Sequence, residues 1–430
     1  MKAPCPHFST CSGCTLQQFP YVKQVRDKSR QILAAFQVFV PQGHEPAEVI
    51  HSVVPSPLEF QYRISTKLCL HEDDQGQKSI GLYRRGSKKV IDIPNCPAHH
   101  PAINRLLKKI FAPARRLPAP FYQHHRRSFQ KGRLKFITIR HSPETNAFGV
   151  ILSHTGVPLV ELQGWMGGLK LTEVSVYASE LTKQDADLVV SRSVEHVSGP
   201  ASFPFQLAGY TFDLDPMAFY QANHSLTDSF IQHIVEGLGG NVLLDLYGGF
   251  GSYSFVAKNR FQSIYVVEAN TRSIEAAERA AAQAQRTDIH TSSEKVETFL
   301  QRFARSSKAQ SVTDVIVNPP RAGLSPIVIR ALLSPQFPNL RRVHYVSCNP
   351  ETLKRDLKQL LAGPQAFRLA NLTPFDMFPQ TDHIECVAKL IKSPQARPAQ
   401  DAGPKKGPRH TTNKPVLKKI VRRPETKKSQ

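Results

Sequence analysis

The sequence predicts an α/β protein in two parts: a β-rich part that ends near residue 200, then a doubly wound, mostly parallel sheet. Between residues 50 and 200, alternating or β-branched apolar segments are separated by turn residues, which is typical of strands. After residue 200, strand-like runs alternate with helix-like runs, which is typical of a parallel sheet covered by helices on both faces. The chain has 430 residues, enough for two or three domains.

The expected elements follow in chain order. A turn-rich segment covers residues 1–20, and residues 20–36 have the spacing of an amphipathic helix. The strands expected in the first part lie in FQYRISTKLCL, SIGLYRR, RLKFITIRHS, AFGVILSH and EVSVYAS. Those expected in the second part lie in NVLLDLYG, SIYVVEAN, DVIVNPP, RVHYVSCN and HIECVAKLIK, with helices between most of them. In such sheets ligands bind beyond the carboxyl ends of the strands.

Composition divides the chain into residues 1–200, residues 201–392 and a tail over residues 393–430. The tail is rich in Pro, Lys and Arg and has few apolar residues, so we expect it to be disordered. Its positive charge should raise non-specific affinity for a phosphate backbone in a salt-dependent way.

The charge of the chain is one-sided, with 56 Lys and Arg against 34 Asp and Glu, a net charge of +22. This balance favours nucleic acid as the partner over an acidic membrane or a generic basic surface. No stretch approaches the roughly 18–20 consecutive apolar residues of a membrane helix. The N-terminus lacks the apolar core of a secretory signal. We therefore expect a soluble, cytoplasmic protein with no membrane partner.

Residues 243–254, LLDLYGGFGSYS, predict a strand that enters a glycine-rich turn before a helix. Gly248, Gly249 and Gly251 allow a tight turn and a close approach to a ligand. Glu268 ends the next strand, where a carboxylate can accept hydrogen bonds from ribose hydroxyls. The pair suits NAD or S-adenosyl-L-methionine, although the absence of a clean GxGxxG weakens the dinucleotide case. A plain turn remains the alternative.

Two further strand ends carry candidate functional side chains. In DVIVNPPRAG, the prolines can hold Asn318 rigidly over a flat substrate, as in enzymes that methylate amino groups on bases. Such enzymes generally have an aromatic residue where Arg321 stands, and a capped strand end is the alternative. In VHYVSCNPETLKRDL, Cys348 ends a strand, with Thr352 as the expected N-cap of the following helix. Cys348 can be a core thiol or a nucleophile, and its place at a strand mouth favours the nucleophile.

Glu385 lies within the strand-like run HIECVAKL. A carboxylate among apolar residues is costly to bury unless it is paired or used. It is a candidate general base, with a paired structural acid as the alternative.

The seven cysteines, an odd number, argue against a disulfide framework in a cytoplasmic chain. Cys5, Cys11 and Cys14 lie within ten residues, which favours a metal or cluster site. Cys96, in the turn-like PNCPAH, is a better fourth ligand than Cys69, which lies inside an apolar strand. The spacing alone leaves zinc and iron–sulfur open.

Taken together, these motifs closely resemble the RNA uracil-5 methyltransferase family, whose members form 5-methyluridine from S-adenosyl-L-methionine. In order and spacing the matching motifs are CPHFSTCSGC, FYQANHSL, LLDLYGGFG, VVEAN, NPPRAGL, YVSCNPETLKRDL and DMFPQTDHIE. The resemblance runs from about residue 5 to 390. It implies a class I (Rossmann-like) S-adenosylmethionine-dependent methyltransferase domain, preceded by a β-rich iron–sulfur RNA-binding domain.

The cysteine segment resembles the family branch that carries a 4Fe–4S cluster, typified by bacterial enzymes that act on 23S rRNA. This resemblance implies a 4Fe–4S cluster held by Cys5, Cys11, Cys14 and Cys96. It favours 23S rRNA as the substrate, with tRNA as the alternative, and a monomer as the functional unit.

The resemblance also implies roles in the reaction. Cys348 corresponds to the nucleophile that adds to carbon 6 of uracil, and Glu385 to the base that removes the proton from carbon 5. The target base is expected to be splayed out of the RNA to reach them. The positions that match cofactor-binding residues are Gln221, Tyr247, Ser252, Glu268 and Asn318.

Asn318 departs from the aspartate usual in the family, so the ammonium group of the cofactor should be held less tightly. Two competing hypotheses stay open on the sequence. A base N-methyltransferase that uses Asn318 needs neither Cys348 nor Glu385. A non-catalytic iron–sulfur RNA-binding protein would keep the fold and bind no cofactor.

Overall fold

The computed structural model describes residues 3–112, 117–126, 128–185, 188–191, 193–363 and 366–392. The tail over residues 393–430, predicted to be disordered and basic, lies outside the described residues. Among the residues that are described, no helix is both long enough and apolar enough to cross a bilayer. Residues 1–393 form one compact unit.

The first sheet contains seven strands in the order β3-β2-β1-β4-β5-β6-β7. The strands are β1 (Ser65–Glu72), β2 (Lys78–Tyr83), β3 (Val90–Asp92), β4 (Leu134–Ser142), β5 (Ala147–His154), β6 (Val174–Glu180) and β7 (Glu195–Ser198). All neighbours are antiparallel except β5 and β6, which are joined through helix α4 (Leu159–Gly167). Each of the five segments predicted to hold strands in this part of the chain does so.

Helix α3 (Pro101–Ile110) and helix α4 cover one face of this sheet and were not expected from the sequence. The spacing of Ile103, Leu107 and Ile110 gives α3 one apolar side, which packs on buried side chains of β4 and β5. The β-rich part of the chain is therefore a helix-backed sheet.

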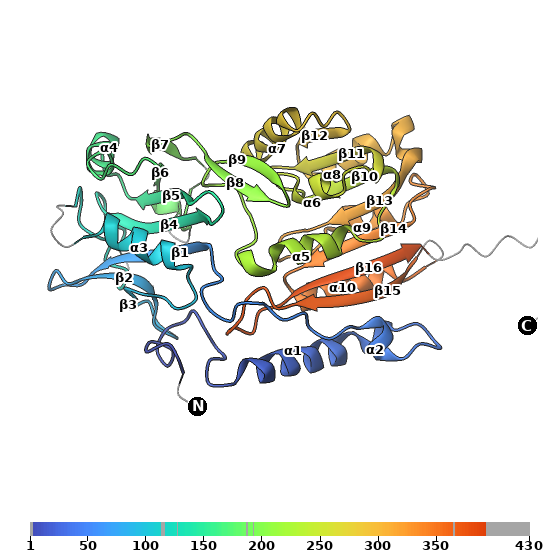
Figure 1. The fold of residues 1–430 in the computed structure, drawn as a ribbon, viewed down its shortest axis with the longest axis horizontal. Helices are drawn as coiled ribbons and strands as arrows, with labels where there is room; N and C mark the ends of the chain where they lie inside the picture. Colours follow the sequence, from blue (N-terminus) through green and yellow to red (C-terminus); the bar gives the residue numbers. More distant parts are fainter. Residues whose placement is uncertain are drawn as a thin grey trace, which may run out of the picture. The chain divides into compact units, whose positions relative to one another are not determined.

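The second sheet also has seven strands, in the order β12-β11-β10-β13-β14-β16-β15 (Figure 1). They are β10 (Gly240–Leu246), β11 (Phe261–Glu268), β12 (Ile289–Ser293), β13 (Val312–Val317), β14 (Arg342–Ser347), β15 (Phe367–Phe375) and β16 (Glu385–Lys392). The first five are parallel, and β16 runs antiparallel to both of its neighbours. The predicted doubly wound, mostly parallel sheet is confirmed, with one reversed strand near its edge.

Helices cover both faces of the second sheet, because its strands are apolar on both sides. Leu243 and Leu244 of β10, for example, belong to opposite cores. One core contains α5 (His224–Val235), α6 (Ser252–Val256), α7 (Thr271–Gln283) and the hairpin of β8 (Phe203–Leu207) with β9 (Tyr210–Leu214). The other contains α8 (Val296–Phe303), α9 (Pro326–Leu332) and α10 (Pro350–Leu360).

The helix predicted near the N-terminus is α1 (Tyr21–Phe36), and it belongs to the second sheet rather than the first. Its Ile32 and Phe36 are buried in the same core as Leu353 and Leu357 of α10. Figure 1 shows α1 alongside α10 and β15, far along the chain from its own position. After the short turns η1 (Gln37–Phe39) and α2 (Pro46–Val49), the chain runs back to the first sheet.

Candidate active site

The carboxyl end of β14 lies beside the start of β16, because these antiparallel strands are neighbours. Their register pairs Ser347 with Cys386, so the next pair along places Cys348 opposite Glu385. The Cys348 side chain is partly exposed, whereas Glu385 is only 5% exposed. The fold thus brings together the two residues that the sequence proposed as nucleophile and base.

The turn after Cys348 is fixed by Asn349 and Pro350. Asn349 is the N-cap of α10, and its Oδ1 accepts a hydrogen bond of 3.1 Å from the backbone N–H two residues on. Proline suits the first helical position because it has no N–H to donate there. The prediction that Thr352 caps this helix is wrong: Thr352 lies inside the first turn, and its hydroxyl donates to the Arg321 carbonyl oxygen at 3.2 Å.

Burial and the Arg321 guanidinium group both affect the pKa values of Cys348 and Glu385. Burial raises the pKa of the Glu385 carboxyl from 4.5 to about 8, and the charge of Arg321 opposes that rise. Burial also raises the pKa of the Cys348 thiol, the Glu385 charge raises it further, and a hydrogen bond from Arg321 lowers it. A carboxyl that titrates near neutrality is suited to accept a proton at physiological pH.

A pocket of about 530 Å³ opens beside Cys348. It is lined by Lys28, Gln31, Ile32, Ala35, Arg321, Cys348, Asn349, Pro350, Glu351, Asp382, His383 and Ile384. Its volume lies within the roughly 300–1,000 Å³ typical of small-molecule sites. Glu385 is not among the lining residues, which agrees with its near-complete burial.

A second cavity lies beyond the carboxyl ends of β10 and β13 and holds four of the five predicted cofactor residues. Gln221, Tyr247, Ser252 and Asn318 all line it. Glu268 does not line it, but the Glu268 carboxylate accepts a hydrogen bond of 3.3 Å from the backbone N–H of a lining glycine, residue 249. The cavity measures about 40 Å³.

The glycine turn beside this cavity is tightly packed. A Cβ on Gly248 would lie 3.0 Å from the Asp245 side chain and 2.9 Å from that of Val266, so a larger residue would displace β10 or β11. Tyr247, just before it, has a positive φ of 60°, a backbone conformation that is strained for an aromatic residue. The N–H groups of the turn's three glycines bond within the protein: Gly248 donates to the Val267 carbonyl oxygen, residue 249 to the Glu268 carboxylate and residue 251 to the Gly248 carbonyl oxygen.

Tyr253 links two of the predicted cofactor residues and was not predicted from the sequence. Its hydroxyl accepts a hydrogen bond of 3.0 Å from Asn318 Nδ2 and is also hydrogen-bonded to Gln221. The side chain is 3% exposed. The Asn318 amide nitrogen is therefore occupied by a hydrogen bond to Tyr253, whereas its side-chain carbonyl oxygen is free to accept a hydrogen bond from a ligand. Asn318 stands where the resemblance leads us to expect an aspartate.

The four cysteines proposed as ligands lie near one another. Cys5 and Cys14 each act electrostatically on Cys96, and Cys5 acts on Cys11. Backbone N–H groups point at the sulfur atoms: Gly13 donates to Cys11 Sγ at 3.3 Å, and Cys96 accepts from residues 98 and 99. Within the described part of the chain, no three His, Cys, Asp or Glu residues are placed to hold a metal ion.

Cys69 lies apart from this group, inside β1, where its thiol is hydrogen-bonded to Tyr83. Burial raises the pKa of Cys69 to about 11.

Two further residues of the site escaped sequence reasoning. Arg321 had a visible signal, because it directly follows the stiff Asn-Pro-Pro turn at a strand end. Lys28 had none, since a lysine on an amphipathic helix is ordinarily exposed and here is 3% exposed.

Comparisons with known proteins relate this chain to RNA methyltransferases. A family model described as tRNA (Uracil-5-)-methyltransferase matches residues 206–393. A Thermotoga maritima protein described as an RNA methyltransferase is 31% identical over 403 residues, covering 91% of this chain and 85% of that relative. A Staphylococcus aureus protein of the same description is 26% identical over 392 residues, covering 90% of this chain and 83% of the relative.

Among solved structures, the Pyrococcus abyssi tRNA (uracil-54, C5)-methyltransferase in complex with S-adenosyl-L-homocysteine superposes with a TM-score of 0.68. The two sequences are 26% identical, and the match covers 90% of this chain and 86% of that one. The predicted class I methyltransferase fold is confirmed.

Proposed function

Because this chain belongs to the RNA methyltransferases of the tRNA (Uracil-5-)-methyltransferase family, we propose that it methylates carbon 5 of a uridine in RNA through a covalent bond between Cys348 and carbon 6. The observation that carries the proposal is the facing pair of Cys348 and Glu385 beside a pocket that can hold a base. The family makes S-adenosyl-L-methionine the methyl donor. Neither base N-methylation nor a non-catalytic role fits that family.

The reaction proceeds in three stages. The Cys348 sulfur adds to carbon 6, which moves electron density onto carbon 5. Carbon 5 then takes the methyl group, and S-adenosyl-L-methionine supplies that group as an electrophile when bound. Glu385 removes the proton from carbon 5, the carbon–sulfur bond breaks, and the ring double bond returns with the thiolate as leaving group.

The polar groups of the second cavity suit the cofactor. In the proposed complex the glycine turn lets the cofactor approach the backbone closely, and the Glu268 carboxylate accepts from ribose hydroxyls. The Asn318 carbonyl oxygen and the Gln221 amide can bind polar atoms of the amino-acid part. These donors and acceptors fit S-adenosyl-L-methionine, with Asn318 supplying a dipole where an aspartate would supply a charge.

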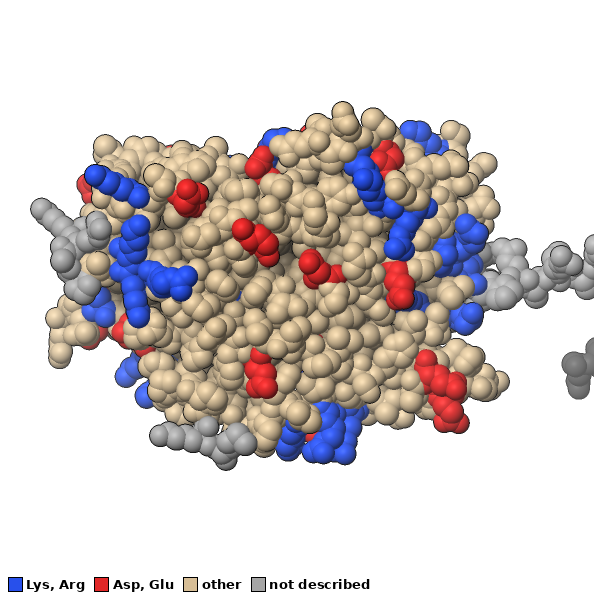
Figure 2. Space-filling view, viewed as in Figure 1, with Lys and Arg blue, Asp and Glu red and all other residues tan. Residues whose placement is uncertain are grey.

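For the substrate we propose 23S rRNA, with tRNA as the alternative. The first rests on the resemblance of the cysteine segment to the cluster-bearing branch, and the second on the Pyrococcus abyssi neighbour, which acts on tRNA. Exposed basic residues suit either RNA: Arg26 and Arg30 on α1, and Arg105, Lys108 and Lys109 on α3. Figure 2 shows Lys and Arg gathered over the α3 region and along α1. We also propose a monomer as the functional unit, on the family resemblance alone.

We also propose that Cys5, Cys11, Cys14 and Cys96 hold a 4Fe–4S cluster. This proposal rests on the resemblance of the cysteine segment to the cluster-bearing branch and on the proximity of the thiols, since Cys5 and Cys14 both act electrostatically on Cys96. The backbone N–H groups directed at two of the sulfurs are of the kind that stabilise cluster thiolates.

The nucleophile is tested by trapping. The wild type and the Cys348→Ala variant are each mixed with S-adenosyl-L-methionine and RNA containing 5-fluorouridine, whose fluorine cannot leave as a proton. Cys69→Ala is the matched control, since Cys69 is a buried thiol in the other sheet. We expect a denaturant-stable protein–RNA product from the wild type and from Cys69→Ala only. A product from Cys348→Ala would overturn the assignment.

The substrate and the cluster have separate tests. Fragments of 23S rRNA and tRNA transcripts compete in the same trapping reaction, and sequencing the trapped RNA identifies the uridine. Iron content and visible absorbance of anaerobically purified protein report the cluster; Cys96→Ala should lose both and Cys69→Ala should keep both. One zinc ion and no iron in the wild type would refute the cluster.

A further inference from the structure

The Glu385 carboxyl is positioned by its backbone rather than by side-chain partners. Among the described residues none donates a hydrogen bond to it, although Arg321 lies close enough to lower its pKa. Glu385 is the first residue of β16 and pairs with Phe375, the last residue of β15. The segment between them, residues 376–384, leads directly into Glu385 and so helps, together with the strand pairing, to set the position of the carboxyl. We name this segment the base loop.

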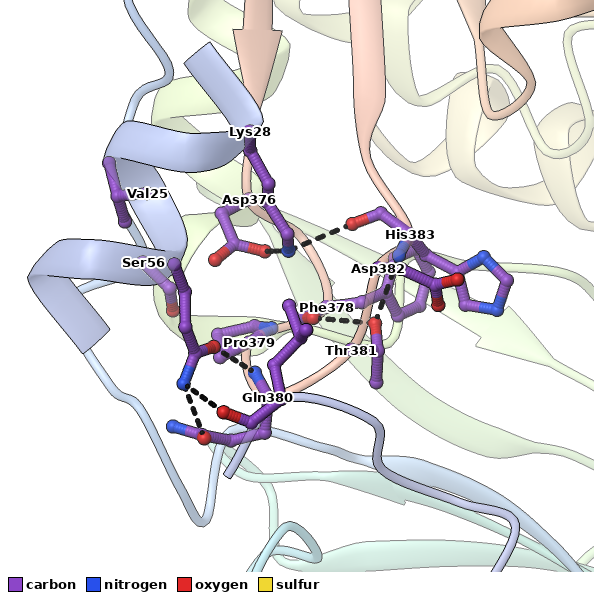
Figure 3. A network of polar contacts seen from close by, with 12 residues as sticks. Val25, Lys28, Ser56, Asp376, Phe378, Pro379, Gln380, Thr381, Asp382 and His383 are labelled. Atoms are coloured by element: carbon purple, nitrogen blue, oxygen red, sulfur yellow. Dashed lines mark hydrogen bonds and ion pairs between the residues drawn. The ribbon is translucent and has the colours of Figure 1, made fainter. Parts of the chain in front are cut away.

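Lys28 of α1 forms hydrogen bonds to both ends of the base loop. Its Nζ donates to Asp376 Oδ1 at 2.8 Å and to the His383 carbonyl oxygen at 3.0 Å. Asp376 begins the loop and His383 stands two residues before Glu385, so one ammonium group joins both ends (Figure 3). The side chains of Lys28 and Asp376 are 4% and 0% exposed, so water does not compete for these bonds.

Gln24 holds the middle of the same loop from one turn earlier on α1. Its Nε2 donates to Gln380 Oε1 at 2.9 Å, and its Oε1 accepts from the Gln380 backbone N–H at 3.2 Å. Gln380 has a positive φ of 68°, so its conformation needs this support. Its carbonyl oxygen accepts from the backbone N–H groups of Thr15 and Leu16, just after Cys14. Spacing of four residues puts Gln24 and Lys28 on one side of the helix.

A buried ion pair is a poor way to gain stability, because desolvation offsets the attraction between the charges. Its value is geometric: it specifies one arrangement of the groups it joins. We propose that Lys28 is a positioning residue for the proton-removal step, acting through the base loop to place the Glu385 carboxyl over carbon 5 of the substrate. This inference rests on the proposed function and deepens it.

The inference predicts which step fails when Lys28 is lost. Both hydrogen bonds that the structure gives the Lys28 ammonium group go to the base loop, on which proton removal depends, and neither goes to β14 or α10, which carry Cys348. Misplacing a catalytic group by about 1 Å costs up to roughly 100-fold in rate. The methylated protein–RNA adduct should therefore form normally and break down slowly in a Lys28 variant.

The test measures both halves of the reaction in Lys28→Met. With 5-fluorouridine RNA, which stops before proton removal, we expect the rate of adduct formation at saturating RNA to stay within about twofold of the wild type. Saturation is required because Lys28 also lines the pocket beside Cys348, so its loss can weaken RNA binding. With ordinary uridine RNA, we expect turnover to fall about 10- to 100-fold while denaturant-stable adduct accumulates. The matched control is Lys23→Met, because Lys23 lies on the same helix and pairs with Asp27 at the surface; it should behave as the wild type.

Lys28→Met leaves the Asp376 charge buried without its partner, which can prevent folding. The double variant Lys28→Met/Asp376→Asn removes both charges and should show the same accumulation of adduct. Equal loss in both assays, or no change in either, overturns the inference. Failure of the wild type to trap any 5-fluorouridine RNA overturns the proposed function instead, so the two failures are distinguishable.

Discussion

Replacing Glu385 with glutamine should make the protein more stable and nearly inactive. Glutamine has the same shape but cannot ionise, so it removes the cost of holding a charge in a site that is 5% exposed. The folded-state pKa of about 8 lies above the usual 4.5, so the carboxyl binds its proton more tightly in the folded protein than in the unfolded protein. Its contribution to stability is therefore complete below pH 4.5 and is lost as pH rises through 8.

The magnitude follows from those two values. Each tenfold difference in proton affinity is worth about 1.4 kcal/mol, so full ionisation of Glu385 costs about 5 kcal/mol of folding stability. Between pH 5.5 and pH 8.5 the wild type should lose about 3 kcal/mol relative to Glu385→Gln. The difference between the two proteins therefore reports this carboxyl together with its electrostatic effect on the Cys348 thiol.

Urea denaturation of both proteins at the two pH values measures the change. In parallel, turnover of uridine RNA by Glu385→Gln should fall by at least about 100-fold, because a general base is worth that much, and the methylated adduct should accumulate. A stability difference that does not change with pH would show that the carboxyl does not carry a buried charge. Turnover near the wild-type rate would show that another group removes the proton.

Three further outcomes are expected. Asn318→Asp should tighten S-adenosyl-L-methionine binding about fivefold in calorimetry, because a charge-assisted hydrogen bond exceeds a neutral one by roughly 1 kcal/mol; equal or weaker binding would contradict this. Gly323→Ala should destabilise the protein by about 2–4 kcal/mol in urea, because φ there is +77° and the added Cβ would lie 2.5 Å from the buried Asp356 carboxylate. Arg321→Met should move the pH midpoint of adduct formation upward, since Arg321 lowers the pKa of Cys348, and an unchanged midpoint would exclude that role.

The sequence by itself determined the local features of the site. An apolar run that stops before Cys348 and a proline that can only begin a helix place the thiol at a strand mouth. Glycines after β10 predict the turn beside the second cavity, and four of the five residues predicted to bind the cofactor line that cavity. These features follow from the sequence because each depends on a few adjacent residues whose backbone preferences are fixed by their own side chains.

Only the tertiary structure decided which distant groups meet. The insertion of β16 between β14 and β15 sets Glu385 opposite Cys348, and no local pattern encodes that strand order. The raised pKa of Glu385 is a property of its burial, which depends on the surrounding elements. In the sequence Lys28 looks like an ordinary surface lysine. Packing of α1 on the second sheet buries it and brings it into contact with Asp376, 348 residues further along the chain. The physical reason is that burial, charge pairing and strand order are set by packing between elements far apart in the chain, where side chains lose water only in the assembled fold.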